Sequence, residues 1–415
     1  MKLELLALPV NQGDAFLLRD EDRAYLFDGG LSEYQAVNHL VRMKGKTLDV
    51  VICSHNDSDH TKGIIGVLGS DDMKVSEVWI PDLWPAFIVN ASRRDAPFFD
   101  AAISDALADW KLRDYWIGRG APSNGVIEDV PRVSEHEDET HMRLLHQSLE
   151  RIAERFRPGQ ENAEGPFLVD DLEGQLRWNL RRRMHSAREP QCNVEWRLAL
   201  SSLSRLRLGQ VSKEDVALAR RVVKSADNIR RIVELAVSKA QRIRFFAYQP
   251  DGGQGDTAVT GTRFTPLNSV EIKTFMRRQV SLSRLLYLSE SNQQSLVFKY
   301  GCNDGPEVLF NSDSDLPFVP KSNLICLAEN SIATAPHHGS RSNASAYAKV
   351  AKKDDVTWVR SGSIRGQIPC MDFRQLPRRY CTICDRRTTR LQPVVLRWSG
   401  KDWRRVAGAH LCPCK

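Results

Sequence analysis

The segment Ser54-His55-Asn56-Asp57-Ser58-Asp59-His60 places two imidazoles and two carboxylates directly after an apolar run. That run, residues 49–53, is typical of a buried strand. A loop at the end of a strand can turn several side chains toward one point. Four ligand-type residues so close together can hold two divalent ions a few ångströms apart. We therefore expect His55, Asp57, Asp59 and His60 to bind metal; a polar turn that caps a helix is the alternative.

Three further motifs carry residue types that suit the same site. In Thr334-Ala335-Pro336-His337-His338-Gly339-Ser340, one imidazole suits a metal ligand and the other an acid or a phosphate contact; a surface His pair is the alternative. Asp313 follows a short apolar strand and could bridge two metals, although Asp-Ser runs are usually turns. Asp28, at the end of an earlier strand, could orient the metal loop by a hydrogen bond.

Basic residues are concentrated in two zones of a chain whose formal net charge is +7. Residues 177–249 contain 17 Lys and Arg against 6 Asp and Glu, and residues 373–415 contain 11 against 2. Such zones suit an acidic polymer, because each neutralised phosphate releases counterions. We therefore expect a nucleic-acid partner; a solvated helical face with a basic tail is the alternative.

The composition points away from membranes and secretion. Hydrophobic residues make up 41% of the chain, and no run approaches the roughly 18 apolar residues of a membrane span. Glu4 interrupts the apolar start, so no leader is expected, and nine cysteines, an odd number, suit a reducing compartment. We expect a cytoplasmic protein without a membrane partner. A regulatory protein partner is left open, and so is the oligomeric state.

Strand and helix patterns divide the chain into four parts. Residues 1–84 carry strand patterns at 3–8, 15–18, 25–27 and 49–53 and a helix pattern at 34–44. Residues 85–242 are expected to be a mostly helical, basic insertion. Strand patterns return within residues 243–372, at 243–248, 262–272, 295–300, 308–311, 324–327 and 358–360. Residues 373–415 form a Cys-rich tail.

Two cysteine pairs lie in this tail. Cys381-x-x-Cys384 and Cys412-x-Cys414 flank a hairpin pattern that turns at Ser399-Gly400-Lys401. Cysteine pairs at the ends of a hairpin are typical of a zinc ribbon. We expect these four cysteines to hold one structural Zn²⁺, with His410 as a substitute ligand; four reduced thiols in a mobile tail are the alternative.

Taken in order, the motifs resemble the metallo-β-lactamase superfamily, most closely its ComEC-like branch, the soluble hydrolase domain of a bacterial DNA-uptake protein. The residues that carry the resemblance are 13–18, 25–30, 54–60, 295–298, 309–313 and 337–340. It covers about residues 1–70 and 290–345. The resemblance implies an α/β fold, a four-layer αβ/βα sandwich with the site at one edge of two facing sheets. The insertion and a zinc-ribbon-like element would be additions to that fold.

The resemblance also implies a ligand set. His55 and Asp57 would hold one metal, Asp59 and His60 the other, and Asp313 would bridge the two. His337 would complete the second metal, with His338 as the competing candidate.

The ligand set departs from the superfamily pattern in two ways. The second loop position is Asp57 where the superfamily often has His, which favours Mn²⁺ over Zn²⁺ more than a His-rich set would. The further superfamily His is not identifiable, so the third ligand of the first metal stays open. No histidine of the insertion stands at a recognisable strand end; these histidines are His136, His141, His146 and His185.

From the resemblance and the charge zones we expect a metal-dependent phosphodiesterase, a nuclease that cleaves DNA or RNA with a metal-bound hydroxide. Two divalent ions, Zn²⁺ or Mn²⁺, would act at the site, with Asp59 and His338 as catalytic residues. His338 or a metal-bound water would donate the proton to the leaving oxygen. Because fold does not fix substrate, a hydrolase of a small ester or cyclic nucleotide is an alternative. An adaptor protein with a relict metal site is another. A bacterial defence system, for example against phage, is a setting that the architecture suggests.

Overall fold

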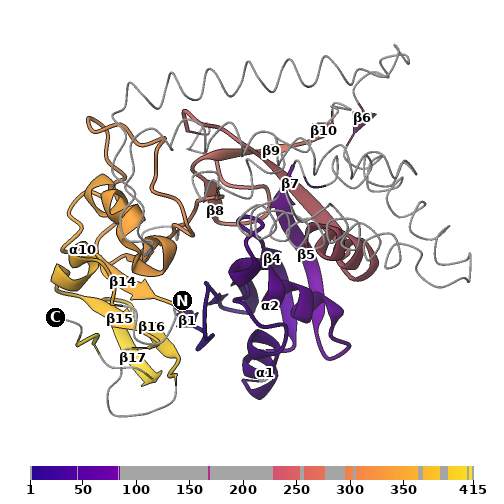
Figure 1. Ribbon diagram of the computed structural model, residues 1–415, viewed down its shortest axis with the longest axis horizontal. Helices are drawn as coiled ribbons and strands as arrows, with labels where there is room; N and C mark the ends of the chain where they lie inside the picture. Colours follow the sequence, from indigo (N-terminus) through magenta and orange to yellow (C-terminus); the bar gives the residue numbers. More distant parts are fainter. Residues whose placement is uncertain are drawn as a thin grey trace, which may run out of the picture.

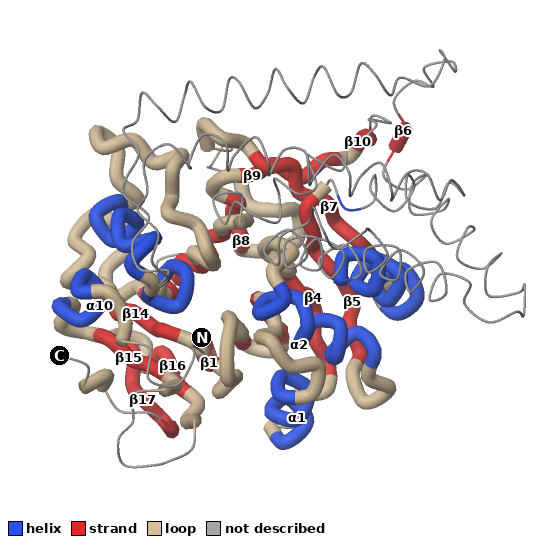
Figure 2. Tube along the Cα trace, in the orientation of Figure 1, coloured by secondary structure: helices blue, strands red, loops and turns tan. Residues whose placement is uncertain are grey.

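The structure is a computed structural model. It describes residues 2–43, 45–82, 84, 167–168, 228–252, 257–275, 295–301, 305–362, 368–383, 391–408 and 411–413. Two mixed β-sheets form the body of the described chain, and helices lie on their outer faces (Figures 1 and 2). This confirms the expected α/β class.

The larger sheet has nine strands, of which β3, β4, β5 and β7 run parallel and the rest pair antiparallel. Their order across the sheet is β17 (Trp403–Gly408), β16 (Val394–Trp398), β1 (Leu3–Ala7), β2 (Phe16–Asp20), β3 (Arg23–Phe27), β4 (Thr47–Ile52), β5 (Lys74–Pro81), β7 (Arg242–Tyr248) and β9 (Ser269–Ile272). The parallel strands place their carboxyl ends at one edge of the sheet.

The second sheet has six strands, and β12 to β15 are parallel. Their order is β15 (Arg379–Cys381), β14 (Thr357–Arg360), β13 (Ile332–Thr334), β12 (Val308–Phe310), β11 (Phe298–Tyr300) and β8 (Phe264–Pro266). A separate pair joins β6 (Phe167–Leu168) to β10 (Thr274–Phe275). The helical segments are α1 (Gln35–Arg42), α2 (Ser58–Gly69), a helix at 228–239, η2 (Pro336–Gly339), η3 (Arg341–Lys349) and α10 (Met371–Gln375).

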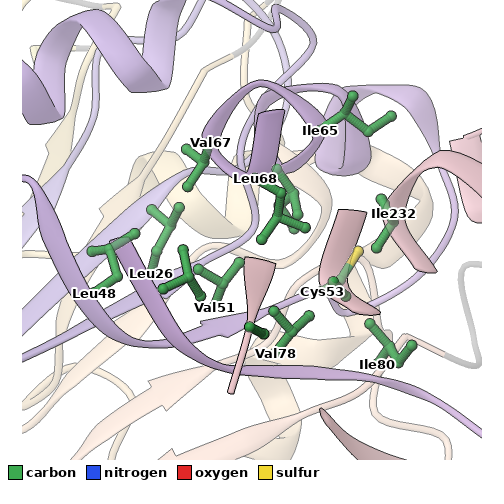
Figure 3. Close-up of a cluster of buried hydrophobic side chains, with 14 of the residues drawn as sticks. Leu26, Leu48, Val51, Cys53, Ile65, Val67, Leu68, Val78, Ile80 and Ile232 are labelled. Carbon is green, nitrogen blue, oxygen red and sulfur yellow. The ribbon is translucent and has the colours of Figure 1, made fainter. Parts of the chain in front are cut away.

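Alternation along the strands sends side chains to opposite faces and produces three buried layers. One layer lies between the nine-stranded sheet and its helices, where Val67 and Leu68 of α2 meet Leu26 and Val51 (Figure 3). An aromatic layer joins the two sheets, and Phe27 stacks on Phe310 with ring centroids 4.7 Å apart. The third layer packs η3 and α10 on the outer face of the six-stranded sheet. The order helices, sheet, sheet, helices is the expected four-layer sandwich.

Most expected elements in the described chain are present, with three differences. The pattern at 262–272 is two strands, β8 and β9, because the chain crosses from one sheet to the other at the buried Asn268. The pattern at 324–327 forms only an isolated bridge between Ile325 and Val350. Helix α2 begins at Ser58, so the second half of the metal loop is its first turn.

The segment expected as a separate tail contributes strands to both sheets. Its hairpin pattern is confirmed as β16 and β17, but β16 pairs with β1 and so extends the nine-stranded sheet. Strand β15 extends the other sheet. The end of the expected insertion also belongs to the main fold. Its helix at 228–239 places Ile229, Ile232 and Ala236 in the buried layer between the nine-stranded sheet and its helices.

The rest of the insertion, apart from residues 167–168, lies outside the described residues. Among the described residues, no helix combines the length and apolarity that crossing a bilayer requires.

Candidate metal site

The predicted ligands gather at the edge where parallel strands of both sheets end. The loop after β4 supplies His55 and Asp57, and the first turn of α2 supplies Asp59 and His60. From the facing sheet, the turn after β12 supplies Asp313, and η2 after β13 supplies His337 and His338. In open α/β sheets, ligands commonly bind at the carboxyl ends of parallel strands.

Asp313 lies at the centre of the cluster and faces four imidazoles. Its Oδ1 is 3.1 Å from His60 Nε2 and 3.8 Å from His338 Nε2. Its Oδ2 is 3.6 Å from His55 Nε2 and 3.5 Å from His337 Nε2. One buried carboxylate is thus shared between two imidazole pairs, each on a different oxygen.

The two carboxylates of the motif, Asp57 and Asp59, each lie beside one of the two imidazole pairs. Asp59 Oδ2 is 3.4 Å from His338 Nε2, and Asp57 Oδ2 is 3.8 Å from His55 Nε2. Three groups of ligand atoms lie within 4.8 Å of one another: His55, His60 and Asp313; Asp59, His60 and His338; and Asp313, His337 and His338. The motif and the two later turns therefore form one cluster.

Each imidazole in the cluster is fixed through its other ring nitrogen. The Nδ1 contacts are His60 to Asp28 Oδ2 at 2.8 Å, His338 to Asp14 Oδ1 at 3.0 Å, His55 to Ser54 Oγ at 2.9 Å and His337 to Asn343 Oδ1 at 2.8 Å. In metal sites, such contacts set the tautomer and orient the ring. All four rings consequently turn Nε2 toward Asp313.

The inward-facing atoms are buried polar groups whose bonding is incomplete. The Nε2 atoms of His55, His60 and His338 and the Oδ1 of Asp313 make charge contacts at 3.1–3.8 Å, but no hydrogen bond of good geometry among the described residues. Buried polar atoms normally have partners, because removing them from water unpaired costs free energy. Converging nitrogen and oxygen donors that lack such hydrogen bonds fit a divalent cation.

The electrostatics of the cluster favour positive charge at its centre. Burial by itself would lower the pKa of His55 and His338, but neighbouring carboxylates outweigh it. Chiefly through Asp313, the pKa of His55 rises to about 9, and chiefly through Asp14 that of His338 rises to about 10. Burial would raise the pKa of Asp313, yet His60 above all holds it well below its usual range. A divalent cation could replace the protons that these imidazoles would otherwise carry.

Comparison with known proteins agrees with this geometry. The family model described as the metallo-beta-lactamase superfamily matches residues 8–147, a range that contains the whole His55 to His60 motif. The chain carries a metallo-β-lactamase superfamily domain. No curated protein matches the chain. Asp313 and the two adjacent histidines lie beyond the matched range, and the fold brings them to the motif.

The structure pairs the adjacent histidines differently from the first expectation. The imidazole that meets Asp59 and His60 is that of His338, the competing candidate. His337 lies instead on the Oδ2 side of Asp313, with His55. The contact expected of Asp28 is present: its carboxylate bonds His60 and accepts the backbone N–H of Ser54 at 2.9 Å.

Sequence reasoning gave Asp14 no role, although the structure buries its carboxylate against His338. The sequence feature that could have indicated this role was its place in the β1–β2 turn, beside the strand end that carries Asp28.

We expect Asp14→Asn to weaken metal binding by roughly 10–100-fold, the usual effect of losing a ligand's outer hydrogen-bond partner. Chelator competition measures this. Asp49→Asn is the control, because Asp49 accepts a backbone N–H of β3 away from the site. Unchanged affinity in Asp14→Asn would contradict the assigned role.

The expected zinc ligands are only partly described. Cys381 and Cys412 are buried in the layer outside the six-stranded sheet. Cys384 and Cys414 lie outside the described residues. Among the described residues, no cysteine belongs to a group with metal-binding geometry.

Proposed function

We propose that this chain is a metal-dependent phosphodiesterase that cleaves DNA or RNA. The observation that carries the proposal is the sharing of Asp313 between two imidazole pairs. Two divalent ions held side by side suit phosphodiester cleavage, because they lower the pKa of a water molecule and offset the charge that develops at phosphorus. The basic zones of the sequence support a nucleic-acid substrate.

The geometry supports one ligand assignment for each ion. Asp59, His60 and His338 would hold one ion, and His55, Asp57 and His337 the other. Asp313 would contribute one oxygen to each. His337 would then be the third ligand that the sequence left open. Three carboxylates against four imidazoles is a mixed oxygen and nitrogen set, which suits Mn²⁺ or Zn²⁺.

The exposed side of the cluster indicates where a substrate would enter. The side chains of Asp57 and His337 are 32% and 29% exposed, whereas that of His60 is fully buried. A phosphodiester would therefore approach from the side of Asp57 and His337. His338 is buried and bonded to Asp14, which suits an ion ligand better than the proton donor that we first expected.

Elemental analysis combined with a plasmid-nicking assay in Mn²⁺, Zn²⁺ and Mg²⁺ tests the proposal. We expect two active-site ions per chain and nicking that falls at least about 100-fold in Asp59→Ala, as for loss of a preorganised charged group. Intact plasmid in all three metals, beside turnover of a small ester, would favour the alternative hydrolase. Full biological activity of Asp59→Ala would favour an adaptor.

We further propose the structural zinc in the Cys-rich segment. Its support is a bridge between Tyr380 and Leu411, together with a 2.8 Å hydrogen bond from Cys412 N to Arg379 O. These contacts bring the strand that ends at Cys381 beside the segment that carries Cys412. Elemental analysis of Cys384→Ser should show the loss of one zinc per chain and the retention of the active-site ions.

A further inference from the structure

The turn that carries His337 and His338 has a backbone conformation that its sequence does not favour. The φ angles of His337, His338 and Gly339 are +44°, +54° and +78°. Only glycine adopts such left-handed angles without cost, so two consecutive histidines there need tertiary contacts to hold them. One backbone contact comes from His337 N, which donates to Ser312 O at 2.8 Å, and another from Cys370 N, which donates to Gly339 O at 2.8 Å.

The contact at the middle of the turn comes from a buried arginine. Arg360, at the end of β14, is 1% exposed, and its Nε donates to His338 O at 2.5 Å. The turn lies directly on this guanidinium: a Cβ added to Gly339 would be 3.4 Å from Arg360 Nε. His338 is therefore held at both ends, its carbonyl by Arg360 and its ring by Asp14.

The guanidinium is itself fixed from the other side. Its Nη1 lies 3.6 Å from Cys381 Sγ, and Arg360 and Cys381 are register partners in the parallel pair of β14 and β15. A planar guanidinium directs several N–H groups at fixed angles, so it can bond the carbonyl and the sulfur together. A lysine ammonium in the same place has no such fork.

We propose that Arg360 is a positioning residue that fixes the His337–His338 turn, so that the His338 ring reaches Asp59 and His60. The metal-binding part of this inference rests on the proposed function. Through the same guanidinium, the strand that carries Cys381 contacts the metal site. Removal of the fork would let the turn relax toward ordinary backbone angles and would withdraw His338 from Asp59.

The first test is made on the metal-free full chain, with ¹⁵N-labelled histidine. In the wild type, the Nδ1 proton of His338 that bonds Asp14 should give a downfield imidazole resonance, assigned with His338→Gln. Arg360→Met should lose or shift that resonance, and Arg360→Lys should shift it less. Arg244→Met is the matched control, since Arg244 is also buried but pairs with Glu77 and Glu271 on the other sheet. It should leave the resonance unchanged.

The second test measures Mn²⁺ and Zn²⁺ affinity of the same variants by chelator competition. We expect Arg360→Met and Arg360→Lys to bind one ion at least tenfold more weakly, while Arg244→Met binds both as the wild type does. If Arg360→Met does not fold, Arg360→Lys decides. An unchanged His338 resonance in a folded Arg360 variant overturns the positioning role. A wild type that binds no ions overturns the proposed function instead, and the resonance test still decides the role of Arg360.

Discussion

Asp313→Asn should abolish both metal binding and hydrolysis. The amide keeps the shape of the carboxylate but removes the negative charge that four imidazoles share, and its NH2 group cannot bind a cation. We expect a loss well beyond the roughly 10–100-fold that removal of an outer hydrogen-bond partner produces. Metal content after dialysis and single-turnover cleavage with added Mn²⁺ would measure the two effects.

Asp315→Asn is the matched control for this variant. Asp315 lies two residues further along the same turn, and no metal-binding group of described residues includes its carboxylate. Its backbone carbonyl, not its side chain, accepts the hydrogen bond from Lys349. The Asp315→Asn variant should bind metal as the wild type does. Wild-type metal content in Asp313→Asn would show that Asp313 does not hold the ions, and the two-ion proposal would fail.

Gly63→Ala should destabilise the protein strongly, because α2 crosses the turn after β3 with no space for a side chain. A Cβ on Gly63 would lie 1.7 Å from Gly29 O, and a Cβ on Gly29 would lie 2.3 Å from Ile64 N. The backbone of α2 would have to move, and with it His60, whose carbonyl accepts the N–H of Gly29. We expect a loss of at least about 3 kcal/mol in the free energy of unfolding, the upper end for overpacking.

Gly69→Ala provides the comparison on the same helix. A Cβ there would meet only Leu235 Cδ1 at 3.9 Å, an ordinary contact. Since alanine favours helix over glycine, its stability should stay within about 1 kcal/mol of the wild type. Urea unfolding of the metal-free variants measures both. Equal midpoints for the two variants would mean that α2 can shift at little cost, and the close crossing would not be what positions His60.

Local pattern was sufficient for much of the sandwich. Short strands such as residues 3–7 and 47–52 follow directly from apolar runs bounded by turns, and the helix at 35–42 follows from its apolar spacing. The motif from His55 to His60 was readable for the same reason, since its ligands are near neighbours in sequence. Its chemistry depends on residue type and spacing, which the sequence states outright.

Sheet membership was not readable from the same patterns. Residues 262–272 look like one strand but divide between two sheets. Strand β16, in the C-terminal segment, pairs with β1 at the other end of the chain. An apolar alternating segment fits any sheet with a free edge, so its partner is decided by which edge the rest of the fold leaves open. The cysteine spacing therefore suggested a separate zinc-ribbon element, whereas in the structure its hairpin extends the nine-stranded sheet.

The motif from His55 to His60 by itself indicated that the chain could bind a metal. The two later motifs indicated the chemical types of the remaining ligands. The tertiary structure decided how they combine. Which of two adjacent histidines meets Asp59 depends on left-handed backbone angles at η2, and these are held by contacts to Ser312, Arg360 and Cys370. Because those contacts come from segments more than 20 residues away in the sequence, local spacing could not distinguish His337 from His338. The same distance concealed Asp14, which meets His338 from 324 positions away.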